Sequence, residues 1–249
     1  MTPILVTEGL SRSFGGVQAV RGVDFALPEG EIRAIIGPNG AGKTTFVGLI
    51  CGRFPATAGR ILFGSDDITR LPAHRRVRRG IAYTFQITSV FRNLTAYENV
   101  ALAVERALLD RRAGDRRHSR TGLQRGVADA LERTGLAARR TMRAGDLSYG
   151  HQRLLELAMG LALKPRLLIV DEPTQGLSDG EIDNFVALMR SIAAETTVLM
   201  IEHNMPVVMA LADRITVFDA GRILAEGAPE EIRRNPAVQA AYLGVSGDG

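Results

Sequence analysis

An eight-residue segment, GPNGAGKT from Gly37 to Thr44, constrains the fold of this chain more than any other feature. It matches the phosphate-binding-loop pattern G-x-x-x-x-G-K-[ST] at every position. The glycines leave room for consecutive backbone N–H groups to turn toward phosphate oxygens, in front of the positive end of the helix that follows. Residues 31–36 (EIRAII) indicate a buried strand and residues 45–50 continue as a helix, which is the order that this loop requires. The sequence therefore predicts an α/β fold with a nucleotide-phosphate site at the end of a strand.

Two side chains of the loop add chemistry that its backbone lacks. Lys43 reaches the terminal phosphates as a point charge, and the Thr44 hydroxyl offers an oxygen ligand to a Mg²⁺ ion that bridges the last two phosphates. The chain has only two lysines, Lys43 and Lys164, so a chain of this composition would contain the pattern by chance roughly 0.002 times. That rarity disfavours the alternative, a glycine-rich turn that binds nothing.

The composition is that of an ordinary globular protein. With 249 residues, of which 45% are hydrophobic, the chain can bury one large core, or one core and a small subdomain. It contains no run of about eighteen apolar residues, and its start, MTPILVTEGL, lacks the charged residues and the long apolar segment of a signal peptide, so we expect a cytoplasmic location. The single cysteine, Cys51, excludes an internal disulfide framework and a zinc site built from cysteines, and we expect it in the core.

The charge balance is mildly basic, with a formal net charge of +4. Because this net charge is small, we interpret the arginine clusters as solvated helix faces or surface segments rather than as a nucleic-acid surface. The clusters consist of Arg75, Arg76, Arg78 and Arg79, and of the stretch from Arg106 to Arg125.

Both ends of the chain show the alternating pattern of antiparallel strands. Residues 4–14 and 17–27 alternate apolar and polar side chains around a Gly-Gly turn. Phe14 ends the first of these strands, where its ring could stack on a nucleotide base, although an aromatic residue at such a place more often packs in a core. A second pair is predicted at residues 213–219 and 222–226, short strands at 60–63 and 81–85, and helical turns at 229–234 and 236–243.

Buried apolar runs end in polar side chains at three places. LLIV precedes Asp171 and Glu172, TVLMI precedes Glu202 and His203, and IAYTF precedes Gln86. Because the carboxyl ends of parallel strands meet at one edge of a sheet, we expect these side chains beside the phosphates. There Asp171 can hold Mg²⁺, Glu172 can polarise a water for attack on the γ-phosphate, and His203 can donate to a γ-phosphate oxygen. Gln86 offers an amide oxygen to Mg²⁺ or to the water; taken singly, each residue could also be structural.

Between Thr95 and Gly160 the pattern changes to helical periodicity. Helices are predicted at residues 96–109, 123–134 and 152–163, as an insertion in the α/β core. The last of them follows the turn Leu147-Ser148-Tyr149-Gly150-His151, which we call the signature turn. Its backbone amides and its serine hydroxyl could hold a second phosphate, or could simply cap the helix.

Taken in order, GPNGAGKT, Gln86, LSYGH, LLIVDE and His203 resemble the motifs of the nucleotide-binding subunit of an ATP-binding cassette transporter, and the resemblance covers nearly the whole chain. It implies a P-loop NTPase core, in which helices flank a mixed sheet, with an antiparallel β subdomain and an α-helical subdomain. It also implies that two subunits sandwich two ATP molecules head to tail, so that the signature turn of one subunit contacts the γ-phosphate held by the other. Residues 176–179 then form the loop that crosses the dimer.

The resemblance assigns a role to each motif. The catalytic residues that it implies are Glu172, His203 and Gln86, and the implied Mg²⁺ ligands are Thr44, Gln86 and Asp171. The implied ATP-binding residues are Phe14 at the adenine, Val17, Gly37, Pro38, Asn39, Gly40, Ala41, Gly42, Lys43, Thr44, Thr45, Ser148, Tyr149, Gly150 and His151.

The signature turn departs from the commonest form, LSGGQ, because Tyr149 replaces its first glycine and His151 its glutamine. Variants with an aromatic residue here occur in the ATP-binding subunits of branched-chain amino acid importers. Further segments resemble that branch in sequence and in position along the chain, namely SFGGVQAV, TFQITSVFRNLTAYENV, IEHNMPVVMALADRI and NPAVQAAYLG. Subunits closely similar to this branch serve urea and other amide or acid substrates.

The resemblance also implies partners and a location. The direct partners are a second ATPase subunit and membrane permease subunits. The permeases contact the region from Thr88 to Asn99, with Phe91 and Leu94 as apolar anchors. A periplasmic or extracellular solute receptor is an indirect partner, and nucleic acid is not a partner. The chain would lie on the inner face of the cell membrane as one domain over residues 1–249. Within it, residues 1–86 and 164–228 form the ATP-binding core with the antiparallel subdomain, 87–163 the helical subdomain and 229–249 a helical tail.

Two other functions use the same motifs. A soluble cassette ATPase could act on nucleic acid or ribosomes through the arginine clusters, but the chain has one cassette, no coiled-coil interruption and no zinc cysteines. The ATPase of an exporter, for example of lipopolysaccharide, shares the core motifs, but the wording of the signature turn and the ending NPAVQAAYLG favour the importer.

Overall fold

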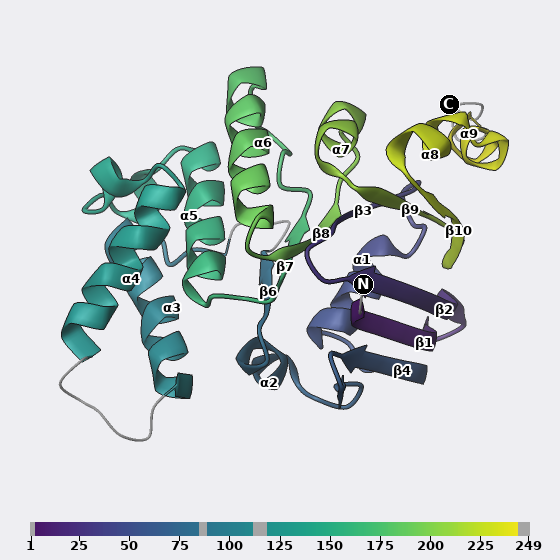
Figure 1. Cartoon of the computed structure of the whole chain (residues 1–249), viewed down its shortest axis with the longest axis horizontal. Helices are drawn as coiled ribbons and strands as arrows, with labels where there is room; N and C mark the ends of the chain where they lie inside the picture. The colour runs from purple at the N-terminus through teal and green to yellow at the C-terminus, as the bar shows by residue number, and fades with distance from the viewer. Residues whose placement is uncertain (1–2, 85–88, 112–118, 244–249) are drawn as a thin grey trace.

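The computed structural model describes residues 3–84, 89–111 and 119–243, and a six-stranded sheet in the order β10-β9-β3-β8-β7-β6 forms its centre (Figure 1). Neighbouring strands run parallel except at β10, which pairs antiparallel with β9. Every residue of β3, β7 and β8 is buried, because helices cover both faces of a parallel sheet. The strands are β3 Ile32–Ile36, β6 Ile81–Thr84, β7 Leu167–Asp171, β8 Thr197–Ile201, β9 Arg214–Asp219 and β10 Arg222–Gly227.

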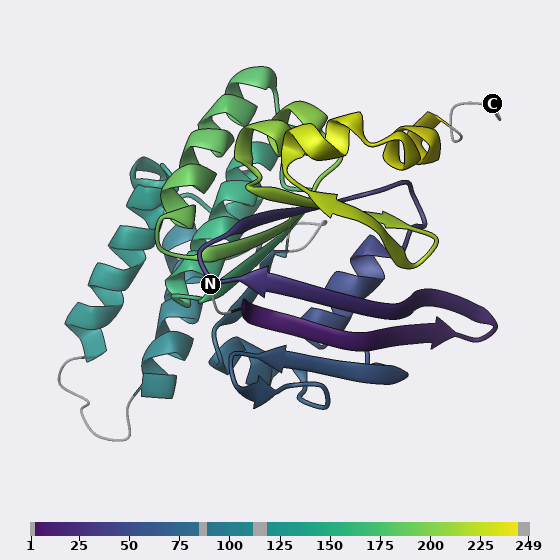
Figure 2. The ribbon, with the colours of Figure 1, turned by 45° about the vertical axis from the view of Figure 1, so that its right-hand side comes forward.

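A second, antiparallel sheet in the order β2-β1-β4-β5 lies beside the first, with α1 (Lys43–Cys51) between them (Figure 2). The core of this layer joins strand and helix through aromatic rings. The Phe46 ring of α1 lies 5.4 Å from that of Phe25 and 5.0 Å from that of Phe218, measured between centroids. The strands of this sheet are β1 Pro3–Phe14, β2 Val17–Pro28, β4 Ala58–Phe63 and β5 Asp66–Asp67.

Apart from the short helix α2, the remaining helices form two groups. Three long helices, α3, α4 and α5, pack around an apolar core of their own at one end of the molecule (Figure 1). Others cover the face of the central sheet opposite α1, where a second cluster contains residues of α5, α6, α7, α8 and α9. The bounds are α2 Ala73–Arg78, α3 Ala96–Arg111, α4 Ser119–Arg133, α5 Tyr149–Ala162, α6 Asp179–Ala193, α7 Met205–Leu211, α8 Pro229–Arg234 and α9 Pro236–Leu243, with short 3₁₀ turns at Ala137–Arg139 and Ala144–Asp146.

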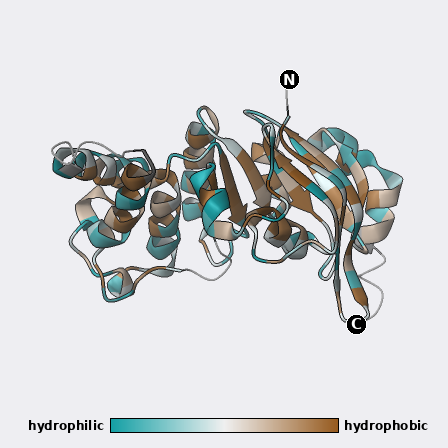
Figure 3. Cartoon of the chain, turned by 90° about the horizontal axis from the view of Figure 1, so that it is seen from below, coloured by the Kyte–Doolittle hydropathy of each residue, from teal (hydrophilic) through white to brown (hydrophobic). Residues whose placement is uncertain are grey.

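Hydropathy follows this layering. The strands at the centre are hydrophobic along most of their length, whereas the helices alternate hydrophobic and hydrophilic residues around their axes (Figure 3). Within the described part of the chain, no helix is both long enough and apolar enough to traverse a lipid bilayer.

Most predicted elements are confirmed, including the strand before the phosphate loop, the helix after it and both antiparallel pairs. The predicted start of α5 at residue 152 is wrong, because the helix begins at Tyr149. Ser148 caps it by accepting a hydrogen bond from the His151 backbone N–H, so most of the signature turn is helical. The periodicity does not predict α2 and α7, since helices of six and seven residues complete fewer than two turns.

The prediction that the whole first arginine cluster is a solvated helix face is wrong for Arg76. This side chain is only 2% exposed. Its guanidinium donates hydrogen bonds to the carbonyl oxygens of Leu49 (2.6 Å) and Ile50 (2.8 Å), near the end of α1, and to those of Leu71 and Thr69. The last carbonyls of a helix lack intrahelical partners, so Arg76 caps the helix that begins with the phosphate loop.

Replacing Arg76 with leucine should destabilise the protein by about 3 kcal/mol, because buried carbonyl oxygens would lose their donors. Chemical denaturation measures the free energy of unfolding. Arg75→Leu is the matched control, since Arg75 is exposed on the same helix, and its effect should stay within about 0.5 kcal/mol. Equal effects of the two substitutions would show that Arg76 is not a buried cap.

Candidate functional site

The phosphate loop, residues 37–44, connects β3 to α1 and is held by close backbone contacts. Gly37 and Gly42 have φ angles of 146° and 98°, in the range that favours glycine. A Cβ atom at Gly37 would lie 2.1 Å from the carbonyl oxygen of Phe218, and one at Gly42 would lie 2.3 Å from that of Ala19. Any larger residue at either position would therefore displace the loop from strands β9 and β2.

Lys43 folds back over the loop that carries it. Its ammonium group donates hydrogen bonds to the carbonyl oxygens of Gly37 (2.6 Å) and Pro38 (2.9 Å). Partial burial lowers the pKa of Lys43, while the nearby carboxylates of Glu172 and Asp171 act in the opposite direction. The lysine therefore lies within the electrostatic reach of both acids at the end of the buried strand β7.

The other loop residues differ in how they can meet a ligand. Ala41 is buried and its N–H donates to the Pro38 carbonyl oxygen (3.2 Å), so its amide is used within the loop. Gly42, Thr45 and Pro38 are half-buried, whereas Asn39, Gly40 and Thr44 are exposed. The hydroxyl of Thr44 is thus open to a ligand.

The register of the central sheet brings the phosphate loop together with two of the three predicted polar strand ends. Ile35 of β3 pairs with Ile201 of β8, and Ile201 pairs with Asp171 of β7. The residues that follow on each strand, which are the phosphate loop, Glu172 and the Glu202-His203 pair, therefore emerge side by side.

Asp171 combines burial with an open coordination position. It is 1% exposed, and its Oδ2 accepts a hydrogen bond of 2.8 Å from the Tyr83 hydroxyl. Its Oδ1 is buried and has no hydrogen-bond partner within the described residues. Burial raises the pKa of Asp171, the hydrogen bond from Tyr83 lowers it, and Glu172 raises it. A buried carboxylate oxygen without a partner among the described residues, near the charge of Lys43, fits a hard divalent cation such as Mg²⁺.

Glu172 and His203 face each other across the ends of β7 and β8. Glu172 Oε1 lies 3.9 Å from His203 Nδ1, and both side chains reach solvent. The backbone of Glu172 adopts a left-handed conformation with φ of 49°, and its N–H donates to the carbonyl oxygen of Ile201 (2.9 Å). This conformation turns the chain sharply after the strand, so that the carboxylate faces the histidine.

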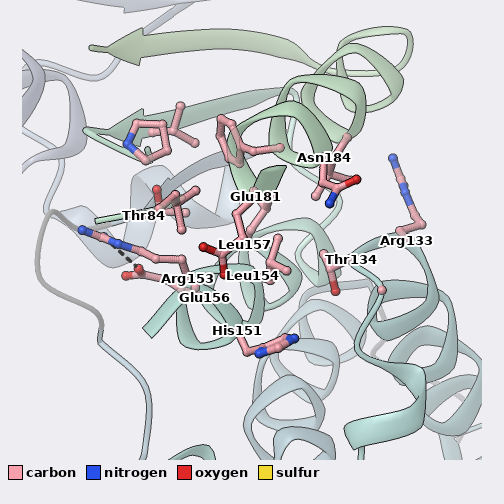
Figure 4. A pocket seen from close by; sticks show the side chains of 17 residues that line it. Thr84, Arg133, Thr134, His151, Arg153, Leu154, Glu156, Leu157, Glu181 and Asn184 are labelled. Atoms are coloured by element: carbon pink, nitrogen blue, oxygen red, sulfur yellow. Dashed lines mark ion pairs between the residues drawn. The ribbon is translucent and has the colours of Figure 1, made fainter. Parts of the chain in front are cut away.

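The signature turn lies at the start of α5, and its two polar side chains contact each other. Ser148 Oγ lies 2.6 Å from His151 Nδ1. His151 lines a cavity of about 360 Å³ between α5 and α6, together with Glu181 and Arg133 (Figure 4). Partial burial is the main cause that lowers the pKa of His151; repulsion by Arg139 adds to it and Glu181 opposes it. The lowered pKa disfavours the protonated ring.

The phosphate loop and the signature turn belong to opposite faces of the central sheet. On one face, Ile35 and Ile169 pack with residues of α1. On the other, Leu168 packs with Leu157 and Leu161 of α5. The helices that carry the phosphate loop and the signature turn, α1 and α5, therefore pack on opposite sides of the sheet within one chain.

Other predicted site residues have varied surroundings. Phe14 is 40% exposed and packs edge-on against Phe54 at 5.4 Å between centroids, and Val17 is exposed. Gln86 and Thr88 lie outside the described residues. Tyr149 is exposed, and the buried Gly150 lies against α6, where a Cβ atom would approach Glu181 Oε1 within 2.6 Å.

Sequence reasoning gave no role to two residues that the structure places next to this site, Tyr83 and Glu202. Tyr83 contacts Asp171, and its hydroxyl at the end of an apolar strand was the only sequence signal for it. Glu202 is 1% exposed and accepts hydrogen bonds from His203, in the loop after β8, and from Thr174, in the loop after β7. A carboxylate directly after the apolar run of β8 was the available signal.

Two family models match this chain. The model described as "ABC transporter" matches residues 20–175, which include the phosphate loop, the signature turn and Glu172. The model described as "Branched-chain amino acid ATP-binding cassette transporter" matches residues 222–248, which begin with β10.

Similar proteins match over nearly their whole length. The high-affinity branched-chain amino acid transport ATP-binding protein BraF of Pseudomonas aeruginosa is 41% identical, over 97% of this chain and 98% of its own. LivG of Escherichia coli, which carries the same description, is 40% identical over the same shares of the two chains. Among solved structures, the ADP conformation of an ATP-binding cassette of an ABC transporter superimposes with a TM-score of 0.85 at 28% identity, and covers 98% of this chain and 100% of its own.

The surroundings of His151 predict how its titration responds to its neighbours. NMR titration of the ring should give a midpoint below that of an unperturbed histidine. Arg139→Gln should raise the midpoint, because it removes a positive charge, whereas Glu181→Gln should lower it, because it removes a negative one. Glutamine still fits the capping box that Glu181 forms with Ser178. A midpoint that moves in the opposite direction in either variant would refute this electrostatic account.

Proposed function

The chain belongs to the ATP-binding cassette family, and from this premise we propose that it is the ATP-hydrolysing subunit of an importer for branched-chain amino acids or related small solutes. The observation that carries the proposal is the convergence of Lys43, Asp171, Glu172 and His203 at one edge of a parallel sheet. The cargo is inferred from relatives that are 40–41% identical over 97% of the chain and are described as branched-chain amino acid transport proteins.

The phosphate loop would bind ATP by exchanging internal hydrogen bonds for phosphate contacts. Lys43 now donates to the carbonyl oxygens of Gly37 and Pro38, and anionic phosphate oxygens are stronger acceptors than these carbonyls. The positive end of α1 lies directly behind the loop and favours negative charge there. Phe14, exposed on the antiparallel sheet, would stack on the adenine.

Thr44, Asp171 and Gln86 would hold Mg²⁺, which supplies positive charge to the β- and γ-phosphates when it is bound. The buried Oδ1 of Asp171 supports this assignment. Glu172 would accept a proton from the attacking water, and His203 would donate a hydrogen bond to the γ-phosphate. Their separation of 3.9 Å leaves both groups able to contact one reacting centre.

We infer that the site is completed by a second cassette subunit. Because the phosphate loop and the signature turn belong to opposite faces of the sheet, Ser148, Tyr149, Gly150 and His151 would contact ATP bound by the other subunit. Residues 1–86 and 164–228 would then bind ATP, residues 87–163 would present the signature turn, and residues 229–249 would form a tail.

A groove supports the proposal that the chain docks on membrane permease subunits. It lies between α2, β6, α3 and α5, has a volume of about 390 Å³ and is mostly apolar. Of the segment predicted to form it, Ser89 lines it, while Phe91 is exposed and Leu94 half-buried nearby in the sequence. A helix of a permease on the inner face of the membrane would fit such a groove, and a solute receptor would act through the permease alone. Apolar groove residues include Val77, Ala82, Leu102, Ala103, Met159 and Leu163.

Reconstitution tests the proposed cargo. The chain would be purified with the permeases and the second cassette of the same transporter, placed in vesicles, and supplied with the matching receptor. We expect ATP-dependent uptake of leucine, isoleucine or valine, and stimulation of ATP hydrolysis by the loaded receptor. Hydrolysis without uptake of any of these solutes would retain the ATPase and reject this cargo.

Lys43→Ala should lower the affinity for ATP by about a hundredfold or more, because the charge that meets the terminal phosphates is removed. Fluorescent ATP analogues measure this directly. Lys164→Ala is the matched control, since it removes the only other lysine of the chain, and we expect unchanged affinity. Equal affinities of the two variants would exclude Lys43 as a phosphate ligand.

Glu172→Gln should bind ATP normally and hydrolyse it about a hundredfold or more slowly, since an amide cannot accept the proton of the attacking water. The ATP-bound variant should accumulate as a dimer, which light scattering would detect. Glu132→Gln, a change at an exposed site on α4, serves as control. Normal turnover in Glu172→Gln would remove Glu172 from the role of base.

A further inference from the structure

Glu202 is a buried carboxylate to which the proposed function assigns no role. It follows β8 directly and is 1% exposed. Its Oε1 accepts hydrogen bonds from the backbone N–H groups of His203 (2.8 Å) and Asn204 (3.0 Å). Its Oε2 accepts from the Thr174 hydroxyl (2.7 Å) and, more weakly, from the Thr174 backbone N–H (3.4 Å). One carboxylate thus joins two loops that are 28 residues apart in the sequence.

The loop that contains Thr174 contacts the signature turn of the same subunit. Thr174 begins a tight turn in which the Leu177 N–H donates to the Thr174 carbonyl oxygen (3.1 Å). Gly176 lies within that turn, and a Cβ atom there would be 3.1 Å from Cε1 of Tyr149. The Tyr149 ring therefore rests directly against the backbone of this loop.

We propose that Glu202 is a positioning residue that couples the two ATP sites of the cassette dimer. In one subunit, His203 would meet the γ-phosphate of one site, while Tyr149 belongs to the signature turn that would meet the ATP of the other. Glu202, Thr174 and Gly176 connect these two residues through an unbroken series of contacts. A displacement of the His203 loop on loss of the γ-phosphate is thereby transmitted to the second site. The proposal rests on the proposed function.

The chemistry of Glu202 suits this task. Its two oxygens together accept four hydrogen bonds, three from backbone N–H groups and one from a hydroxyl. Hydrogen bonds to an ionised acceptor are stronger than neutral ones, and a rigid buried carboxylate transmits the motion of one loop to the other. An apolar residue of similar size would fill the space but would leave the two loops independent.

The substitution Thr174→Val tests the coupling between the two ATP sites separately from the stability of the fold. It removes the short hydroxyl bond to Glu202 while the contacts of Glu202 with the His203 loop remain. The assay is ATP hydrolysis by the full chain in its complex with the second cassette and the permeases. The KM for ATP should stay within about twofold, the maximal rate should fall about tenfold, and the Hill coefficient should fall toward 1. Thr174→Ser, which keeps the hydroxyl, should restore both rate and cooperativity.

Thr196→Val is the matched control, because Thr196 is also buried but lies just before the opposite end of β8. It should leave the rate and the Hill coefficient unchanged. A double-mutant cycle with Glu202→Gln adds a second criterion, since two changes in one linkage should not be additive in their effect on the maximal rate. Melting temperatures of all variants separate these kinetic effects from loss of folding.

Three results would overturn the coupling proposal. They are a wild-type Hill coefficient of 1, a Thr174→Val variant as fast and as cooperative as the wild type, and additive effects in the cycle. An unmodified complex that binds ATP without hydrolysing it would instead reject the proposed function itself, so the two failures can be told apart.

Discussion

The parallel register of β3, β8 and β7 is the constraint on which the rest of this site depends. Ile35, Ile201 and Asp171 lie in one row across the sheet. Because their strands end together, every residue that follows them enters the same space, whatever its distance along the chain. The loop is then fixed against that edge by the contacts of Gly37 and Gly42 with neighbouring carbonyl oxygens, which leave no room for a side chain. Backbone pairing of the strands therefore determines where the residues of the site lie, independently of contacts between their polar side chains.

Apolar runs and turn residues made this edge predictable from the sequence, but not the contacts behind it. A continuous apolar run is typical of a strand in a parallel sheet that helices cover on both faces. The ends of β7 and β8, near Asp171 and His203, could therefore be placed in advance. The burial of Arg76 could not, because a short basic helix looks the same whether one arginine faces solvent or the end of α1. The bond between Thr174 and Glu202 depends on tertiary packing across 28 residues, which no local pattern encodes. Gln86, predicted from the strand that precedes it and from the order of the motifs, lies outside the described residues and stays a prediction.

Buried charge has a consistent use in this structure. Arg76, Asp171 and Glu202 are each almost inaccessible to solvent, and burying an isolated charge is costly. Arg76 and Glu202 offset that cost with four hydrogen bonds each. The bonds of Arg76 hold the end of α1 and the segment before α2, and those of Glu202 join the loops that follow β7 and β8. Asp171 is the exception, since one of its oxygens has no partner among the described residues. The contrast separates two structural anchors from a group that is ready to bind a ligand.

The left-handed conformation of Glu172 explains why such anchors flank it. A non-glycine residue in this region costs of order 1–3 kcal/mol, so the conformation persists only where the surroundings enforce it. On one side, Asp171 is held in β7 and the Glu172 N–H bonds to Ile201. On the other, Thr174 is held by Glu202. With both flanks fixed, the strained turn directs the Glu172 carboxylate toward His203. The hydrogen bond between Thr174 and Glu202, which helps to maintain this strain, also connects the site to the loop beside Tyr149. Orientation of the proposed base and communication with the second site thus rest on one buried carboxylate.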